Sequence, residues 1–286
     1  MADGELPGGY FDAAGRLQRD FDLAVLTGRE EELLTRTRHA GPAAQITEVL
    51  SRCVRRLGDI SPVPAEVVRD LLVADRHYLM LQLRRATFGD RVRADLFCPW
   101  ADCGERVSLD FALADVPIEA PAQPGRVHRM TLSDRRPVEF RLPTGADQEL
   151  LAGRLAENEA AALTTLLARC LFRLGDETPD EDAVAALPAS VRAEIEQRMR
   201  EVAPSVAQTI DVRCTACGRM FAAPFDIQRF FLGELRTDGA LLYQEVHYLA
   251  YHYHWAESEI MEMTRDKRRT YIDVLADAIG ALNDGA

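Results

Sequence analysis

Apolar residues recur at helical spacing in two stretches that lie far apart in the chain. In the first stretch, residues 44–57, they fall at Ile46, Val49, Leu50, Cys53, Val54 and Leu57. This is the three-to-four-residue period of a helix with one buried face, and Gly58 follows where a glycine C-cap would stand. A further helix is expected over residues 64–83. Residues 163–174 and 191–199 repeat the pattern in the later part of the chain.

Between these helical stretches, polar and apolar residues alternate strictly. The alternation covers residues 128–132 and 138–142, with turn-forming residues 133–136 between them, and so predicts a hairpin. By analogy, residues 10–28 are expected to contain a short hairpin as well. The whole pattern predicts an α+β fold that is mostly helical, with short β-hairpins.

The two helical stretches also resemble one another in sequence. Matching segments recur in the same order: Thr27-Gly28 with Thr144-Gly145, Arg52-Cys53 with Arg169-Cys170, Arg56-Leu57-Gly58-Asp59 with Arg173-Leu174-Gly175-Asp176, and Pro64-Ala65 with Pro188-Ala189. The first three pairs are each separated by 117 residues. Chance similarity between two Arg- and Leu-rich helices is the alternative. We interpret the matches as an internal duplication with a first repeat over 1–116, a second over 117–240 and a C-terminal aromatic helical extension over 241–286.

Four of the six cysteines form two short knuckles. Each knuckle lies between two strand-like runs and is followed directly by a glycine, as Cys98 and Cys103 are by Gly104 and Cys214 and Cys217 are by Gly218. A Cys-x2–4-Cys turn of this kind is typical of a zinc knuckle, and two of them supply the four thiolates of a structural site. We therefore predict that Cys98, Cys103, Cys214 and Cys217 bind one structural zinc ion that joins the two repeats.

Two other interpretations of these cysteines remain open. Cys214 and Cys217 could form a redox pair, although the βαβ context of such pairs is missing and the Cys98/Cys103 spacing does not suit it. An iron–sulfur centre is the second alternative. The remaining two cysteines, Cys53 and Cys170, fall on the apolar faces of helices and are expected in the core.

Charge and hydropathy narrow the classes of function. The formal net charge of −12 argues against a surface that follows a phosphate backbone. No apolar run approaches the ~20 residues that cross a bilayer, and the first residues lack the pattern of a secretory signal, so we expect a cytoplasmic protein without a membrane partner.

We expect no catalytic site. A phosphate-binding glycine loop and a nucleophile elbow are both absent from the sequence. His247, His252 and His254 lack the i, i+4 spacing of zinc-protease helices and lie in a segment rich in tyrosine, which favours an aromatic packing helix.

The two ends of the chain resemble known assembly proteins. The opening Leu6-Pro7-Gly8-Gly9-Tyr10-x-Asp12-x-x-Gly15 and the later Leu71-x-x-x-Asp75-Arg76-x-Tyr78-Leu79 resemble tail assembly proteins of contractile phages and phage-tail-like injection systems. The segment His252-Tyr253-His254-Trp255-x-Glu257-x-Glu259-Ile260-Met261 resembles the ending of the T4-type baseplate hub assembly family. The resemblance implies a structural or chaperone-like assembly role, with other tail, tube or baseplate proteins as partners.

The candidate anchors for such partners are aromatic. Phe230, Phe231 and the segment 243–255 could contact other chains, although each of these side chains would also suit a core. The main rival function is a zinc-ribbon nucleic-acid-binding or regulatory protein, which would need a basic stripe beside the knuckles. Arginines do flank them, at positions 91, 93, 106, 213 and 219. A zinc-stabilised enzyme subunit is a further rival, and it would need a polar pocket.

Overall fold

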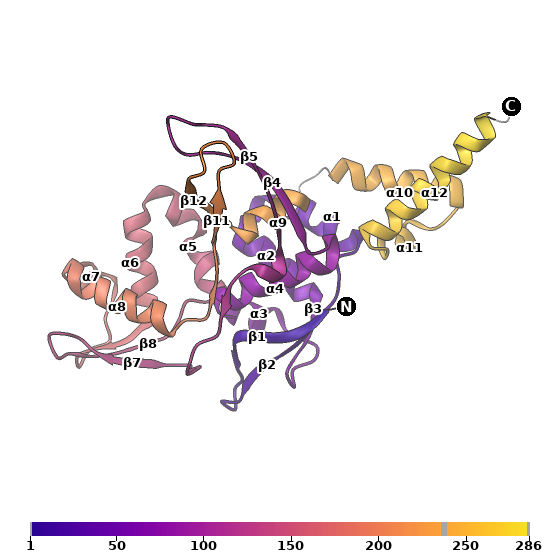
Figure 1. The fold of residues 1–286 in the computed structure, drawn as a ribbon. Coiled ribbons are helices and arrows are strands. Elements are labelled where there is room, and N and C mark those ends of the chain that lie inside the picture. Colours follow the sequence, from indigo (N-terminus) through magenta and orange to yellow (C-terminus); the bar gives the residue numbers. More distant parts are fainter. Residues whose placement is uncertain (1, 236–238, 285–286) are drawn as a thin grey trace.

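The computed structural model describes residues 2–235 and 239–284 and has an α+β architecture that is mostly helical, as predicted (Figure 1). The first half contains β1 (Ala2–Phe11), β2 (Leu17–Leu23), α1 (Gly28–Arg36), α2 (Pro42–Cys53), β3 (Val54–Leu57), α3 (Ala65–Asp70), α4 (Val73–Phe88), β4 (Arg91–Phe97) and β5 (Arg106–Ala112). The second half contains β6 (Ile118–Glu119), β7 (His128–Thr131), β8 (Pro137–Phe140), α5 (Gly145–Glu157), α6 (Glu159–Cys170), β9 (Leu171–Leu174), α7 (Glu181–Ala185), α8 (Ala189–Val202), β10 (Ser205–Val206), β11 (Thr209–Arg213), β12 (Met220–Pro224) and α9 (Ile227–Leu235). Helices α10 (Gly239–Tyr253), α11 (Glu257–Met261) and α12 (Arg265–Asp284) follow.

The two halves have the same order of elements at their start. Each has a hairpin, which in the second half follows the short strand β6, and then two helices and a strand that pairs with the hairpin, giving the sheets β1-β2-β3 and β7-β8-β9. Strands β3 and β9, which return beside the hairpins, also pair at equivalent residues. Phe21 pairs with Leu57 in the first sheet, and their counterparts Val138 and Leu174 pair in the second. Both ladders shift register before their last pair.

The returning strands correct one prediction. The helices expected to reach Leu57 and Leu174 end at Cys53 and Cys170, and the four residues after each cysteine form β3 and β9. Val54 and Leu57 are both buried although they are three residues apart, because the ladder with β2 shifts register between Val54 and Arg56 and breaks the regular alternation of the strand. Hydrogen bonding to β2 makes residues 54–57 a strand. Gly58 then turns the chain after this strand instead of capping a helix.

The helix expected over residues 64–83 is also interrupted. Helix α3 ends at Asp70 and α4 begins at Val73, with extended backbone at Leu71 and Leu72. The carbonyl of Leu71 accepts a hydrogen bond from the backbone N–H of Gly145, at 3.0 Å. The break between α3 and α4 therefore leaves the Leu71 carbonyl free to bind the first residue of α5, the first helix of the second half.

The predicted helix starts at the two threonines are present. Thr27 and Thr144 cap α1 and α5, and the side chains of Glu30 and Asp147 accept a hydrogen bond from the backbone N–H of their capping threonine, at 2.9 and 3.0 Å. Such a reciprocal box satisfies the free N–H groups at a helix start and favours its conformation.

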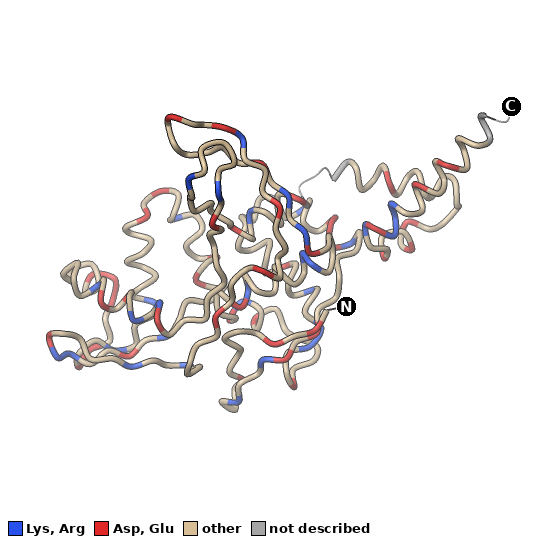
Figure 2. Tube along the Cα trace, in the orientation of Figure 1, with Lys and Arg blue, Asp and Glu red and all other residues tan. Residues whose placement is uncertain are grey.

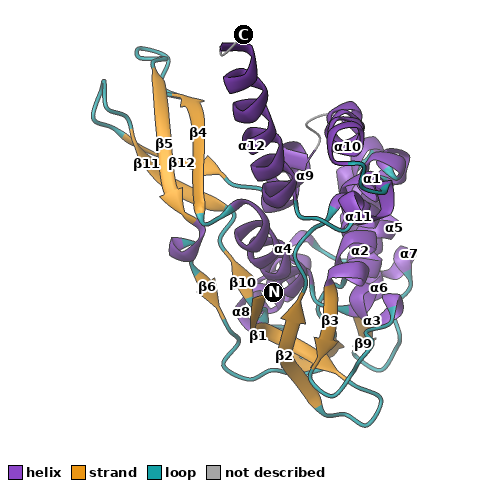
Figure 3. Cartoon of the chain, turned by 90° about the vertical axis from the view of Figure 1, so that its right-hand side faces the viewer, coloured by secondary structure: helices purple, strands orange, loops and turns teal. Residues whose placement is uncertain are grey.

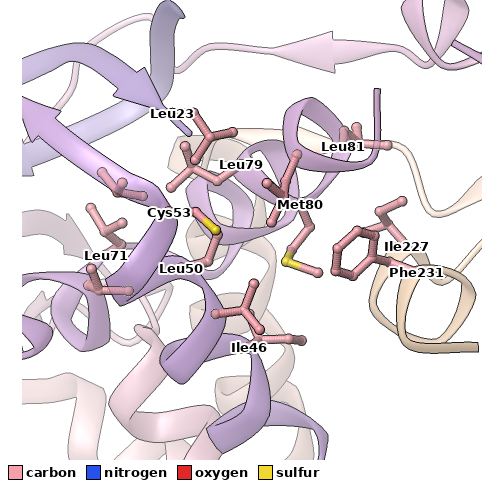
Figure 4. Packing of buried hydrophobic residues seen from close by; sticks show 14 of the residues in the cluster. Leu23, Ile46, Leu50, Cys53, Leu71, Leu79, Met80, Leu81, Ile227 and Phe231 are labelled. Carbon is pink, nitrogen blue, oxygen red and sulfur yellow. The ribbon is translucent and has the colours of Figure 1, made fainter. Parts of the chain in front are cut away.

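The largest core lies in the first half and includes a helix from the end of the second (Figure 4). Ile46 and Leu50 of α2 and Met80 of α4 pack with Ile227 and Phe231 of α9. Helix α9, although placed in the segment 117–240 by the sequence, thus covers the helices of the first half. A separate core lies between β8, α6 and α8 of the second half.

The two cysteines outside the knuckles are core residues, as predicted. Cys53 and Cys170 are 1% and 0% exposed. Burial raises the pKa of each thiol to about 12, so both stay protonated at neutral pH.

Helices α10 and α11 pack against α1, and α12 packs on α10, at one end of the molecule (Figure 1). Figure 3 views the molecule from that end. Their core contains Leu242, Val246, Leu249, Ile260 and Met261, with Trp255 stacked on Tyr253 at a ring separation of 4.6 Å. The aromatic packing expected of this segment is thus present, whereas His247, His252 and His254 are exposed. None of the described helices combines the length and the apolar character that crossing a membrane requires.

Candidate metal centre

Two hairpins, β4–β5 and β11–β12, lie side by side and extend from the helical body (Figures 1 and 3). Strand β4 pairs with β5 from Arg91 opposite Ala112 to Phe97 opposite Arg106, and β11 pairs with β12 along its whole length. A small apolar cluster joins the hairpins, formed by Val107, Val212 and Ala223 together with the cysteines. The hairpin turns hold the two knuckles, so one knuckle comes from each half of the chain.

The four predicted ligands converge at the ends of these hairpins. The Sγ atoms of Cys98 and Cys217 are 3.8 Å apart, as are those of Cys103 and Cys214, and all four lie within 4.8 Å of one another. The first cysteine of each knuckle therefore contacts the second cysteine of the other. A tetrahedral site with metal–sulfur distances of about 2.3 Å places its sulfurs about 3.8 Å apart. A disulfide needs about 2.05 Å, so the geometry fits a shared metal ion.

Backbone geometry supports the knuckles. Gly104 and Gly218 have φ angles of 62° and 73°, in the left-handed region that favours glycine. The N–H of Cys98 donates to the carbonyl of Glu105 at 2.9 Å, and the N–H of Cys214 donates to that of Arg219 at 3.0 Å. These bonds close the hairpin directly below each knuckle and hold the cysteines toward each other.

Amide groups in the turns favour the thiolate form of Cys217 and Cys103. The backbone N–H of Arg219 and its guanidinium lower the pKa of Cys217 to about 6. The backbone N–H of Glu105 acts in the same way on Cys103, but burial and the three neighbouring sulfurs outweigh it and raise the pKa of that thiol to about 12. Four adjacent thiolates repel one another, and a divalent cation bound between them removes that cost.

An ion pair that the sequence did not reveal links the two knuckles. Arg219, in the second knuckle, donates to both carboxylate oxygens of Asp102, in the first, at 2.7 Å. Its guanidinium also lies 5.0 Å from the ring centre of Trp100. The spacing of the cysteines alone gives no signal for this pair, because it depends on how the hairpins face each other.

Three of the other four arginines beside the knuckles have acidic partners too, and Figure 2 shows blue and red alternating along these hairpins. The fourth, Arg213, donates to the carbonyl of Gly218 at 3.5 Å. Arg91 and Arg93 both pair with Asp110, at 2.9 and 3.4 Å, and Arg106 pairs with Asp95. The strands therefore carry paired charges instead of a basic stripe.

The ends of the hairpins carry exposed apolar side chains that sequence reasoning also missed. Phe97 is 74% exposed, Met220 48% and Trp100 40%. Successive side chains of a strand point to opposite faces, and Phe97 directly follows the inward-facing Leu96. This alternation is the sequence signal that predicts an exposed Phe97.

The aromatic anchors predicted from the sequence divide into two groups. Phe231 is fully buried and Phe230 packs under the guanidinium of Arg84, so both belong to the core. Tyr243 and Tyr251 on α10 are 46% and 69% exposed and remain available for contact.

Comparison with known protein families identifies the chain. The family described as T4 bacteriophage base plate protein matches residues 18–232. The chain belongs to this family. The match spans the helices of both halves and both hairpins with their cysteines, so the resemblance predicted from the sequence is confirmed. No curated protein and no solved structure matches the chain.

Membership in the baseplate family assigns the chain a structural place in a phage tail. A baseplate protein contacts other tail components, and the exposed apolar side chains described above are the kind of surface through which proteins associate.

Proposed function

We propose that the protein is a non-enzymatic structural or assembly component of a contractile tail or injection-system baseplate or tube, stabilised by one structural zinc ion. The observation that carries the proposal is the crosswise cluster of four cysteine sulfurs between two hairpins of a baseplate-family chain. Zinc bound there would be a closed four-thiolate anchor without an open coordination position. The chain's own surfaces would then make the functional contacts.

We further propose that the two halves arose by internal duplication. The equivalent sheets, capping threonines and knuckles support it, and so do equivalent hydrogen bonds. The N–H of Ala24 donates to the carbonyl of Cys53 at 2.8 Å, and that of Arg141 donates to Cys170 at 2.9 Å. In each knuckle the first cysteine is buried and the second is half-buried. The metal site would lie where the two copies meet.

Protein partners fit the surface better than nucleic acid does. Four of the five arginines beside the knuckles are paired with aspartates, and the chain carries a net charge of −12, so few positive charges are free to neutralise phosphates. Phe97, Trp100 and Met220 offer an apolar contact surface at the hairpin ends. We place the protein in the cytoplasm of the producing cell before it enters a tail particle.

Elemental analysis tests the metal. Protein purified without added metal should contain about one zinc per chain, and Cys98→Ser or Cys214→Ser should abolish it. Cys53→Ser is the matched control, because this cysteine is buried far from the knuckles in the core and should keep the zinc despite lower stability. A metal-free wild-type protein would refute the zinc site.

Affinity purification from the native host tests the role. The tagged protein should recover tube, spike or baseplate subunits, and a triple change of Phe97, Trp100 and Met220 to serine should reduce that recovery while zinc content stays the same. Recovery of nucleic acid or polymerase subunits in their place would overturn the assembly role.

A further inference from the structure

One arrangement of three helices occurs three times along the chain. Helices α2, α3 and α4 form it in the first half, α6, α7 and α8 form it in the second half, and α10, α11 and α12 form it at the C-terminal end. In each case a long helix packs on a short one, and the chain then breaks for a few residues before the last helix begins. We call these the first, second and third helix triplets.

An arginine stands at the same place in all three triplets. Arg76, Arg192 and Arg268 each follow the first residue of α4, α8 or α12 by three positions. Arg76 donates to the carbonyl of Val68 in α3 at 3.1 Å. Arg192 donates to the carbonyl of Val184 in α7 at 2.7 Å. The first and second triplets are therefore equivalent in this contact as well as in the order of their helices.

The first and third triplets each hold the start of another helix. Gly145, the first residue of α5, donates its N–H to the carbonyl of Leu71 at 3.0 Å, in the break between α3 and α4. Gly28, the first residue of α1, donates to the carbonyl of Met263 at 3.2 Å, in the break between α11 and α12. The arginine of each of these two triplets is 0% exposed. A Thr-Gly helix start thus docks in the same way at both places.

The second triplet has the same surface but holds no such helix. Leu187, two residues before α8, corresponds to Leu71, two residues before α4, yet it is only half-buried, as Arg192 is. Ala160 of α6 is exposed, whereas its counterpart Ala43 of α2 is buried. Within the described part of the chain, no helix lies across α6 and α7 as α5 lies across α2 and α3. An uncovered end of repeated helices is a surface on which a further unit can stack.

The charge of this open surface matches the acidic start of α1. Glu31 of α1 pairs with Arg268 of the third triplet at 2.8 Å, and both side chains are buried. Arg192, the counterpart of Arg268, bonds to a carbonyl and to the hydroxyl of Thr164, and it has no carboxylate partner among the described residues. A carboxylate placed as Glu31 is placed would give Arg192 a charge-assisted hydrogen bond.

The covered end and the open end lie at opposite sides of the molecule. Figure 1 shows α11 and α12 beside α1 at one side, and α7 and α8 at the other. The start of α1 is therefore covered by the third triplet of its own chain, and it lies far from the open second triplet of that chain. Only another copy can bring α1 to this surface.

We propose that the second triplet of one copy binds the start of α1 from another copy, and that α11 and α12 prevent this contact by covering α1 in the free protein. In the contact, the N–H of Gly28 bonds to the carbonyl of Leu187, and Glu31 pairs with Arg192. Because the contact joins two different surfaces, copies with a released α1 associate head to tail.

Release of the covering helices tests the proposal. Wild-type protein should be monomeric in analytical ultracentrifugation. Full-length Arg268→Met loses the arginine that binds Glu31, so it should form dimers and larger species that increase with concentration. Arg268→Met/Arg192→Glu should be monomeric by itself, because its open surface repels Glu31. Mixed with wild type, this double variant should give a 1:1 dimer and nothing larger, since the wild type offers an open second triplet but keeps its own α1 covered.

Matched controls change exposed arginines on the same two helices. Arg269→Met leaves the bond between Arg268 and Glu31 in place, so this variant should stay monomeric. Arg268→Met/Arg198→Glu should associate as Arg268→Met does, because Arg198 is an exposed residue of α8 that pairs with Glu201. All variants should keep the zinc content of the wild type, which makes the result independent of the proposed metal site.

A peptide of residues 24–38, which contains the start of α1, provides a second measurement. It should bind wild-type protein and bind Arg192→Glu at least tenfold more weakly. A monomeric Arg268→Met together with a peptide that does not bind would overturn the proposal. So would association of Arg268→Met that Arg192→Glu does not reduce. Peptide binding without association of Arg268→Met would assign the open surface to a helix of another protein and overturn self-association.

Discussion

Single glycines show how closely the helical units of this protein approach one another. Gly145, the first residue of α5, packs against the buried guanidinium of Arg76, and a Cβ added there would lie 2.4 Å from Arg76 Nη1. Gly28 has the equivalent place on α1, where a Cβ would lie 3.0 Å from Met261 Sδ. In each half, the Thr-Gly pair thus does two things: threonine caps the helix, and glycine permits its docking.

Gly145→Ala should therefore destabilise the protein by about 1–3 kcal/mol, the usual cost of forcing extra atoms into a packed core. Gly153→Ala is the control on the same helix, since no atom lies within 4 Å of a Cβ there. That change should stabilise the helix by about 0.5–1 kcal/mol. Urea denaturation measures both, and equal effects would contradict the role assigned to Gly145.

Two buried groups on α4 give opposite pH dependences. Burial raises the pKa of Asp75 to about 6, against 3.8 ordinarily, although the N–H groups of Gly8 and Gly9 donate to its carboxylate. Its contribution to stability is therefore present at low pH and is lost as pH rises through 6. Burial lowers the pKa of His77 to about 4 from 6.5, so its contribution is lost as pH falls from about 6.5 toward 4.

Between pH 4 and 6 the two contributions oppose each other in the wild type. Asp75→Asn removes the first, so the free energy of unfolding should rise more steeply with pH in this variant than in the wild type. His77→Gln should have the reverse effect and make the rise shallower. Denaturation curves at several pH values measure these slopes, and parallel profiles for all three proteins would refute the assignment.

At the level of elements, sequence patterns predicted more of the hairpins and knuckles than of the helix ends. The cysteines were found because ligand spacing and the glycine after each knuckle are local features that the metal site requires. Val54 to Leu57 were misassigned because the four residues fit a helix locally, and pairing with β2, which is distant in sequence, decides their conformation. Leu71 and Leu72 break a predicted helix for a similar reason, since their partners Gly145 and Thr144 lie in the other half.

The hairpins have little apolar core of their own, so their order should depend on the metal. Their shared cluster consists of a few residues around the cysteines, whereas Val92, Phe111 and Ile210 nearer the helical body pack in the core of the first half. Removing zinc with a strong chelator should expose the amides of residues 96–107 and 212–221, which surround the cysteines, to hydrogen exchange. Amides of α2 and α4 should keep their protection. Exchange that spreads through the whole chain, or none at all, would contradict a local role for the metal.

Across the whole molecule, a buried ionic network attaches the C-terminal helices to the first half. Arg268 of α12 is 0% exposed and donates to Glu31 of α1 at 2.8 Å and to Glu245 of α10 at 2.9 Å. Sequence reasoning had no means of finding this network, because its members are separated by up to 237 residues.

Arg268→Met should cost about 3–5 kcal/mol, since it removes the arginine hydrogen-bonded to two buried carboxylates and leaves them only the longer contacts to Arg265 at 3.5 Å and Arg269 at 3.8 Å. Its neighbour provides the control: Arg269 is 53% exposed and lies 3.8 Å from Glu245. Arg269→Met should change stability by less than about 1 kcal/mol. Limited proteolysis should detach residues 239–284 from the folded body in Arg268→Met alone. Equal proteolysis of both variants would show that the network does not hold these helices.

The crosswise contact between the knuckles also bears on the order of events during synthesis. Cys98 and its contact Cys217 are 119 residues apart, and neither half of the chain contains more than two of the four thiols that meet. A ribosome must therefore translate well past residue 217 before a four-thiolate set can close. Until then each knuckle has only two thiols, so firm binding of the proposed zinc would mark a chain whose two halves have both been made and brought together.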